Sequence, residues 1–495
     1  MITEELKYRI TTAIGHTPTD EQRQAIAVFA DFMADRRDES VMVLSGSAGT
    51  GKTTLAAAIV RALAALGQKM VLLAPTGRAA KVFAHYAGTA AFTVHRRIYR
   101  QRSLEGGFDL NFNAARDTLF IVDEASMVNS SADGSIFGSG SLLDDLIAFV
   151  YGAGRRQAAQ GNNCRLLLIG DQAQLPPVGE LSSPALQPSV LSSYGLHVYE
   201  SALHEVLRQA QESGILWNAT HIRGYGEKST PAERGDGLLR LPQVCIQGFT
   251  DIHIVPGDEL IEQLATSYSR AGLDDTIVIT RSNKRAIVYN QGIRRSILDR
   301  EDELCCGDRL MIVKNNYYWM TASHASNNEQ QTIEFLANGD TAVVQRVRNI
   351  HEQHGFRFAD VTMTLPDYDD YELTATVLLD TLGSEAPSLT REQQTQLYER
   401  VMADYADIPL KQDRLKAVRQ DRYYNALQVK FAYAVTCHKA QGGQWSHVYI
   451  DQGYMTDDML TPDYLHWLYT AFTRATDQLY LVNWPKTQVS DDRQI

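Results

Sequence analysis

The chain is poor in cysteine, in long apolar runs and in net positive charge. Its 495 residues include only five cysteines, which form no CxxC pair, and this argues against a disulfide framework or a zinc site. No apolar run approaches the roughly 18 residues that would suggest a membrane span. The N-terminus carries early acidic residues where an export signal would need an apolar core. We therefore expect a soluble, cytoplasmic protein with no membrane partner.

Positive charge is the minority sign: 47 Lys and Arg stand against 59 Asp and Glu, a formal net charge of −12. This balance excludes whole-molecule attraction to nucleic acid or to an anionic membrane, although a local basic path remains possible. Hydrophobic residues make up 44% and charged residues 21%, which is ordinary for globular proteins. The length predicts about three or four domains.

Short, continuous apolar runs alternate with helical patterns along the chain. Such runs are typical of strands buried on both faces, and their alternation with helices predicts a parallel sheet covered by helices. This alternation of apolar runs and helical patterns extends over the first 200 residues and recurs near the middle and the end of the chain. The runs are 41–44, 70–73, 119–122, 165–169, 276–279, 448–450 and 479–482. We predict an α/β protein of two lobes, the second interrupted by inserted sequence.

A phosphate-binding loop is the clearest motif in the chain. Residues 46–53 match G-x-x-x-x-G-K-[ST] in full, after a β run and before an Ala- and Leu-rich helical pattern. Glycines let backbone N–H groups wrap a phosphate, and the helix N-terminus favours its charge. We expect Lys52 to reach the β- and γ-phosphates of ATP and Thr53 to hold Mg²⁺. The nucleotide-binding residues predicted here are Gly46, Gly49, Gly51, Lys52, Thr53 and Thr54.

Two acids follow the apolar run 119–122. Asp123 is expected to join the Mg²⁺ shell, and Glu124 to polarise the attacking water. Paired acids after a buried strand also occur as helix N-caps, but their position downstream of a phosphate-binding loop favours the catalytic interpretation.

Several further segments resemble the motifs of superfamily 1 helicases, and most closely the RecD-like and Dda-like branch, superfamily 1B. They are 123–127, 170–178, 434–442 and 469–475, and the resemblance extends from about residue 19 to 481. It implies two RecA-like P-loop NTPase domains, with a small β-hairpin insertion in the first and an SH3-like β insertion in the second. The expected domains are 1–200, with the hairpin at about 99–118, then 201–320 together with 426–495, and the insertion at 321–425. The insertion carries helical decoration, opened by a capping box at residues 390–393.

The resemblance also implies residue roles around the nucleotide. Gln22 would read adenine, with a solvated Gln in an N-capped helix as the alternative. Gln174 would report the γ-phosphate, and Arg208 and Arg474 would reach it from the second lobe, unless either forms only a surface or interlobe ion pair. Many relatives place Tyr before the first of these arginines, but this chain has Leu207, which leaves the adenine-stacking residue open. Gln441 and Gly442 would couple their loop to the nucleotide.

A second group of residues resembles the family's path for nucleic acid. Those on the first lobe are Thr76, Arg78, Thr93 and His95, and those on the second are Thr436, His438 and Lys439. Basic residues with an interleaved aromatic, as in the segment 96–102, suit a single strand. The alternatives are a solvated helix end for the arginine run and a buried core histidine for His438.

The segment 99–118 is long enough for a hairpin with Gly106 and Gly107 at its tip. In RecD-like and Dda-like motors such a hairpin parts the duplex. Phe108 and Phe112 are therefore candidates for an apolar wedge.

These features together predict an ATP-dependent helicase that moves on single-stranded DNA and opens forked duplex DNA, with 5′→3′ polarity implied by the resemblance. It would act as a monomer, because both arginines lie in the chain that carries the phosphate loop. The alternatives are a nucleotide switch without motor action and an ATPase subunit of a nuclease or repair complex. The motifs do not distinguish DNA from RNA.

Overall fold

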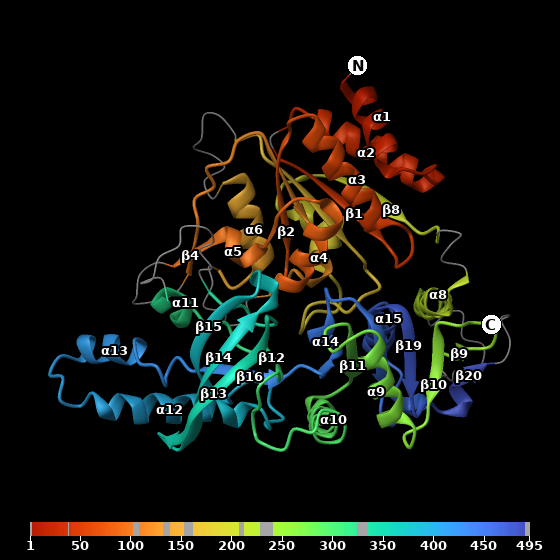
Figure 1. The fold of residues 1–495 in the computed structure, drawn as a ribbon. Helices are drawn as coiled ribbons and strands as arrows, with labels where there is room; N and C mark the ends of the chain where they lie inside the picture. The colour runs from red at the N-terminus through yellow and green to blue at the C-terminus, as the bar shows by residue number, and fades with distance from the viewer. Residues whose placement is uncertain are drawn as a thin grey trace.

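A six-stranded parallel sheet forms the first lobe of the computed structural model, which describes residues 2–37, 39–101, 108–131, 139–152, 162–206, 212–227, 241–323 and 335–490. The strand order is β3-β2-β6-β7-β1-β8, and every neighbouring pair is parallel. The strands are β1 (Ser40–Gly46), β2 (Lys69–Ala74), β3 (Ala91–Thr93), β6 (Thr118–Val122), β7 (Arg165–Gly170) and β8 (His197–Leu203). This lobe lies at the top of Figure 1.

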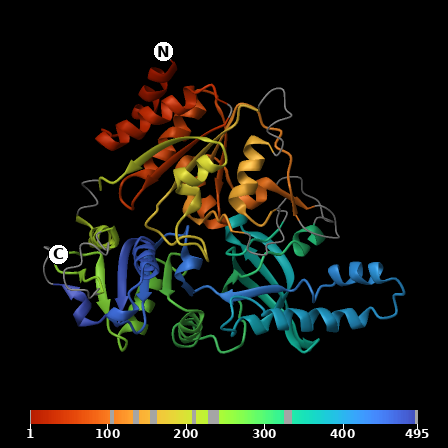
Figure 2. The same cartoon turned by 180° about the vertical axis from the view of Figure 1, so that it is seen from behind.

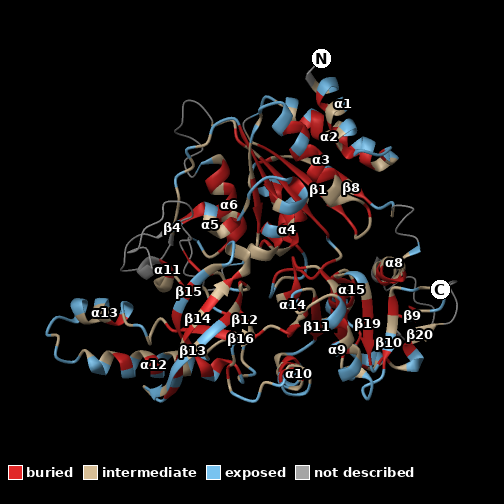
Figure 3. Cartoon of the chain, viewed as in Figure 1, coloured by how far each residue is buried: buried red, intermediate tan, exposed pale blue. Residues whose placement is uncertain are grey.

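Helices cover both faces of this sheet, which explains its continuous apolar strands. Successive residues of a strand point to opposite faces: Met42 and Leu44 pack with α1, α2 and α3, whereas Val41 and Val43 pack with α5 and α6. The helices of the lobe are α1 (Ile2–Ile14), α2 (Asp20–Ala34), α3 (Lys52–Ala65), α4 (Gly77–Ala87), α5 (Val94–Ile98), α6 (Leu142–Tyr151) and α7 (Pro188–Ser193). Figure 3 shows the buried strands between helices whose outer faces are exposed.

A second parallel sheet, of five strands, forms the other lobe, in the order β10-β19-β18-β11-β17. Its strands are β10 (Ile252–Val255), β11 (Thr276–Thr280), β17 (Ala434–Thr436), β18 (Trp445–Asp451) and β19 (Ala475–Val482). Its helices are α8 (Gly214–Glu227), α9 (Leu260–Arg270), α10 (Asn283–Ser296), α14 (Cys437–Ala440) and α15 (Pro462–Phe472), beside the short pair β9 (Val244–Cys245) and β20 (Val489–Ser490). The predicted α/β fold with two RecA-like lobes is confirmed.

A closed five-stranded barrel stands beside the second sheet and shares a hydrophobic core with it. Its strands are β12 (Arg309–Ile312), β13 (Thr341–Gln353), β14 (Phe356–Leu365), β15 (Tyr371–Leu378) and β16 (Leu427–Phe431). The barrel therefore extends past both ends of the predicted insertion, 321–425. Its first and last strands are short and lie in sequence next to strands of the second lobe, so their apolar pattern does not reveal the sheet they join.

Two helices, α12 (Arg391–Asp404) and α13 (Lys411–Arg419), project sideways from the barrel in both ribbon views (Figures 1 and 2). The predicted capping box opens α12: Gln393 N–H donates to Thr390 Oγ1 at 3.2 Å, and Thr390 N–H donates to Gln393 Oε1 at 3.0 Å. Leu397, Val401 and Val418 pack the pair against the end of the barrel.

The segment predicted as a hairpin contains β4 (Tyr99–Gln101), which pairs antiparallel with β5 (Phe108–Leu110). Gly106 and Gly107, predicted at the tip, lie outside the described residues. The short helix α11 (Tyr318–Ser323) follows β12. Across the residues the structure describes, no helix combines the length and apolarity needed to cross a membrane.

Candidate nucleotide and nucleic-acid sites

The phosphate-binding loop connects β1 to α3, as its motif requires. Gly49 and Gly51 have φ of 76° and 80°, a left-handed conformation that glycine adopts without strain. Lys52, the first residue of α3, donates from Nζ to the carbonyl oxygens of Gly46 and Ser47, at 2.5 and 2.8 Å. The same Nζ lies 3.8 Å from Asp171 Oδ2. The ammonium group therefore sits over the loop, where a phosphate would be gripped.

Gln22 supports the phosphate-binding loop through a hydrogen bond to its backbone. Its side chain completes a capping box with Thr19 at the start of α2, and its Nε2 donates to the carbonyl of Thr50 at 3.2 Å. The helix is thus N-capped, but Gln22 is 1% exposed and not solvated. No residue that stacks on adenine is apparent from these contacts.

The two acids follow β6 at the edge of the sheet. Glu124 N–H donates to Asp123 Oδ1 at 2.9 Å, and Glu124 itself has φ of 51°, a strained conformation of the kind that gathers at functional sites. Burial, and then the neighbouring Glu124 charge, raise the pKa of Asp123 above its ordinary value. A divalent cation would offset both effects, and a carboxylate together with the hydroxyl of Thr53 is a suitable donor set for Mg²⁺.

Arg474 of the second lobe lies against these acids. It follows α15, is 2% exposed, and is held by the carbonyls of Thr470 and Gly443 at 3.0 and 3.1 Å. Gln174, with its amide oriented to satisfy both neighbours, donates to Glu124 Oε2 at 3.3 Å and accepts from Arg474 Nη2 at 3.2 Å. Arg474 Nη1 is 3.9 Å from Glu124 Oε1. Gln174 thus bridges the lobes beside the phosphate loop.

Tyr469 makes a second bridge, which sequence reasoning missed although it lies within the motif 469–475. Its hydroxyl donates to Asp171 Oδ2 at 2.6 Å and accepts from Ala48 N–H in the phosphate loop at 2.8 Å. Gln441 Nε2 donates to the carbonyl of Leu175, the residue after Gln174 in the first lobe, at 2.7 Å.

Arg208, expected beside the γ-phosphate, and its neighbour Leu207 lie outside the described residues. Among the described residues, another arginine of the second lobe reaches the loop: Arg223 of α8 donates from Nη1 to Ser47 Oγ. No sequence signal marked Arg223, because it lies outside every recognised motif and approaches the loop only through the packing of α8.

On the first lobe, two of the residues predicted to contact a nucleic-acid strand cap helices. Thr76 accepts from Ala79 N–H at the start of α4, and Thr93 accepts from Arg96 N–H at the start of α5, both at 3.2 Å. His95 is half-buried, and burial lowers its pKa to about 4, which keeps the ring neutral.

Arg78 faces the second lobe. Its guanidinium carbon lies 4.0 Å from the ring centroid of Trp445, and Nη2 donates to the carbonyl of Gln444 at 3.0 Å. Gly442, expected to couple to the nucleotide, packs here instead: a Cβ on it would lie 3.1 Å from Thr76 Oγ1 and 2.9 Å from Ala79 Cβ.

The second-lobe residues predicted to contact nucleic acid lie at the end of β17 and in the helix α14 that follows it. Thr436 is half-buried, and His438 is exposed, so it is not the buried core histidine of the alternative interpretation. Lys439 donates to Asn338 Oδ1, and burial, with Lys430 nearby, lowers the pKa of Lys439 to about 8. Phe112 is 79% exposed, whereas the side chain of Phe108 lies outside the described part.

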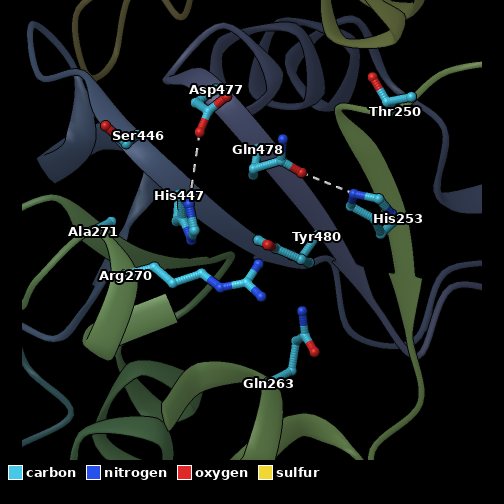
Figure 4. Close-up of a pocket in the computed structure, with 10 residues that line it drawn as sticks. All are labelled: Thr250, His253, Gln263, Arg270, Ala271, Ser446, His447, Asp477, Gln478 and Tyr480. Atoms are coloured by element: carbon cyan, nitrogen blue, oxygen red, sulfur yellow. Dashed lines mark hydrogen bonds and ion pairs between the residues drawn. The ribbon is translucent and has the colours of Figure 1, made fainter. Parts of the chain in front are cut away.

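A separate polar pocket of about 610 Å³ lies wholly within the second lobe, between α9 and the strands β10, β18 and β19 (Figure 4). Arg270 points into it, His253 contacts Gln478 at 2.8 Å, and His447 lies 3.8 Å from Asp477. None of the predicted site residues lines it.

Two family models match this chain: an AAA domain at residues 17–138 and a UvrD-like helicase C-terminal domain at 431–482. The ATP-dependent RecD2 DNA helicase of Deinococcus radiodurans is 32% identical over 214 residues, which are 41% of this chain and 24% of that protein. The ATP-dependent DNA helicase Dda of Enterobacteria phage T4 is 23% identical over 372 residues, 71% of this chain and 75% of that protein. Both family models and both relatives thus make the chain similar to superfamily 1B helicases of the RecD and Dda type.

The chain matches only about a quarter of the length of RecD2. A crystal structure of Pif1 helicase from Bacteroides with ADP–AlF3 and single-stranded DNA aligns over 96% of this chain and 95% of that chain, at 15% identity and a TM-score of 0.44. That similarity is too weak to add to the assignment.

Proposed function

We propose that this protein is an ATP-dependent DNA helicase of superfamily 1B that moves 5′→3′ on single-stranded DNA and opens forked duplexes, hydrolysing ATP between its lobes. The observation that carries the proposal is the bridge from Glu124 through Gln174 to Arg474, which joins the lobes beside the phosphate loop. An ATPase built in this way senses its γ-phosphate from both lobes, within one chain. That self-contained site also supports action as a monomer, and we place the protein in the cytoplasm.

The residues divide the work on the nucleotide. The loop amides and Lys52 bind the phosphates, and Gln22 is proposed to read adenine. Thr53 and Asp123 would hold Mg²⁺, which supplies charge neutralisation when bound. Glu124 orients and deprotonates the attacking water, and Arg474 stabilises charge developing on the transferred phosphoryl group. Arg208 is proposed as a second such arginine, and Arg223 at Ser47 is an additional candidate.

Coupling to movement follows from the same bridge. With ATP bound, Arg474 and Gln174 turn from Glu124 to the γ-phosphate, and the lobes close around a group that both contact. Hydrolysis and phosphate release remove that group, and the lobes part. The residues predicted to contact single-stranded DNA lie on α4 and α5 of the first lobe and on the segment after β17 of the second. Opening and closing of the lobes therefore changes the distance between the two sets of DNA contacts. Phe108 and Phe112 are proposed as the wedge.

The test measures ATP hydrolysis with and without single-stranded DNA, and unwinding of duplexes with a single 5′ or 3′ tail. We expect strong stimulation by DNA and unwinding from the 5′ tail. Lys52→Ala should abolish hydrolysis while single-strand binding persists. An unchanged rate on adding DNA would favour a nucleotide switch, and efficient unwinding from a 3′ tail alone would overturn the polarity. Parallel assays with single-stranded RNA decide the choice of nucleic acid.

A further inference from the structure

Trp445 stands between the predicted strand path and the nucleotide site. It is the first residue of β18 and is 5% exposed. On one side its ring receives the guanidinium of Arg78 from the first lobe, at 4.0 Å, and the carbonyl of the preceding residue, Gln444, accepts from Arg78 Nη2 at 3.0 Å. Arg78 is therefore fixed to the second lobe at two adjacent points.

On the other side, Trp445 is tied to Arg474. Its backbone N–H donates to the carbonyl of Arg474 at 3.0 Å. Gly443 packs closely against the Trp445 ring, since a Cβ added to Gly443 would lie 2.3 Å from a ring carbon. The carbonyl of Gly443 accepts from Arg474 Nη1 at 3.1 Å. The position of the ring thus fixes Gly443, and Gly443 holds the guanidinium that reaches Glu124 and Gln174.

We propose that Trp445 is a positioning residue that transmits occupancy of the strand site at Arg78 to the orientation of Arg474 at the γ-phosphate. The inference deepens the proposed function and rests on it. A strand phosphate near Arg78 would take the edge N–H groups that Arg78 now donates to the carbonyl of Gln444, because an ion pair with phosphate is stronger than a hydrogen bond to a neutral carbonyl. Without that bond, the guanidinium would be drawn off the face of the Trp445 ring. When Arg78 turns to the phosphate, the ring, Gly443 and Arg474 are released together to adopt the arrangement that serves ATP.

The chemistry of the contact requires a planar ring and a planar cation. A guanidinium stacks on an aromatic face while its edge donates a hydrogen bond, as Arg78 does to Gln444, whereas a lysine ammonium cannot do both in this geometry. An aliphatic side chain at 445 would fill space beside Gly443 but would not attract Arg78.

The experiment compares Trp445→Leu with Trp445→Phe in the full chain, measuring the ATPase rate with and without a saturating single-stranded oligonucleotide. We expect the ratio of the two rates to fall at least about tenfold in Trp445→Leu, as for loss of a desolvated cation–π contact, and to be largely retained in Trp445→Phe. A packing role alone would lower both rates together and leave the ratio unchanged, which would overturn the proposal.

Trp484→Leu is the matched control. Trp484 is also 5% exposed and belongs to the same hydrophobic cluster, but packs against Phe472 away from Arg78, so its loss should lower thermal stability without changing the stimulation ratio. Arg78→Ala should lower the ratio as Trp445→Leu does, and the double variant should lose no more than either single one, since residues acting as a unit are non-additive. Additive losses would contradict the link. If the wild-type protein shows no stimulation, the proposed function fails instead.

Discussion

The two parallel sheets end their central strands with an acid, but they use that acid in opposite ways. Asp123, after β6, accepts one backbone hydrogen bond within the described chain, from Glu124, and burial raises its pKa. Asp451, the last residue of β18, is 3% exposed and accepts from Arg285 Nε at 3.0 Å, from the Tyr289 hydroxyl at 2.7 Å and from Gly453 N–H at 2.8 Å. The first acid is left open to a ligand, whereas the second is saturated by its own lobe.

The difference fits the division of ATP hydrolysis between the two lobes that we propose. The first lobe keeps phosphate-binding groups at the carboxyl ends of its strands, the usual ligand edge of a parallel sheet. The second lobe neutralises the acid at its own carboxyl edge and contributes Arg474 from the turn that leads into β19. In the proposed mechanism, the first lobe therefore carries the groups that would activate water and bind Mg²⁺, and the second lobe carries the arginine that would complete the site.

The strongest test of this division is Glu124→Gln. Loss of the proposed base should reduce the rate of ATP hydrolysis about 10³-fold, within the range for general bases. Binding of nucleotide and of single-stranded DNA should persist, because the phosphate loop and the strand path are unchanged. Single-turnover hydrolysis and fluorescence binding assays measure the two quantities. Near-normal hydrolysis would assign the base elsewhere.

Asp451→Asn is the counterpart in the second lobe. Asparagine keeps one acceptor oxygen but lacks the charge and the second oxygen, so Arg285, Tyr289 and Gly453 N–H cannot all be satisfied. The variant should therefore lose stability in urea while the folded protein hydrolyses ATP normally. A specific loss of hydrolysis with unchanged stability would mean that both acids serve the reaction, and the contrast between the lobes would be wrong.

A third carboxylate, Asp340 just before the barrel strand β13, sharpens the comparison because it is buried and forms no ion pair with any described residue. Oδ2 accepts from the Tyr368 hydroxyl at 2.6 Å and from Ala337 N–H at 2.7 Å, while Oδ1 is buried beside Gly77 of α4 with no hydrogen-bond partner in the described structure. Burial raises the pKa of Asp340 from 3.8 to about 7, with the nearby Asp367 adding to the rise and Arg96 opposing it.

Because the folded state binds this proton more tightly than the unfolded state, Asp340 favours folding below pH 3.8, and that contribution is lost as the pH rises to about 7. Asp340→Asn should therefore be more stable than wild type at pH 8, by at most about 4 kcal/mol for a shift of this size, and equal to it near pH 4. Urea unfolding across this pH range measures the difference. A constant difference at all pH values would show that folding does not raise the pKa of Asp340.

The smallest expected effect is on the KM for ATP, and it distinguishes two capping boxes, those of α2 and α12. Gln22 in α2 and Gln393 in α12 make the same reciprocal bonds to an N-cap threonine, but only Gln22 also donates to the phosphate loop, at Thr50. Each residue changed to Ala should cost about 1 kcal/mol of stability or less. Only Gln22→Ala should also raise the KM for ATP, in steady-state assays. An equal rise in Gln393→Ala would mean that general destabilisation, and not loop support, sets the KM.

What could be predicted from the sequence was local. The phosphate loop, the capping box at Thr390 and the buried strands follow from residues within one or two turns of one another, and the structure contains each of them. The barrel boundary was not predictable, because β12 and β16 close it from positions more than 100 residues apart. Tyr469, Arg223 and Trp445 were missed for the same reason: each acts through a partner on the other lobe that no nearby pattern indicates.

Local sequence is enough to specify the fold class, the phosphate loop and the acids that follow β6, since glycine conformations, strand burial and helix dipoles depend on short stretches of chain. The tertiary structure alone decided that Asp123 stays open while Asp451 is saturated, that Arg474 meets Glu124, and that Arg78 stacks on Trp445. Those outcomes depend on which groups the packed lobes bring within hydrogen-bonding distance and remove from water, and a side chain's charge and partners are fixed only at that point.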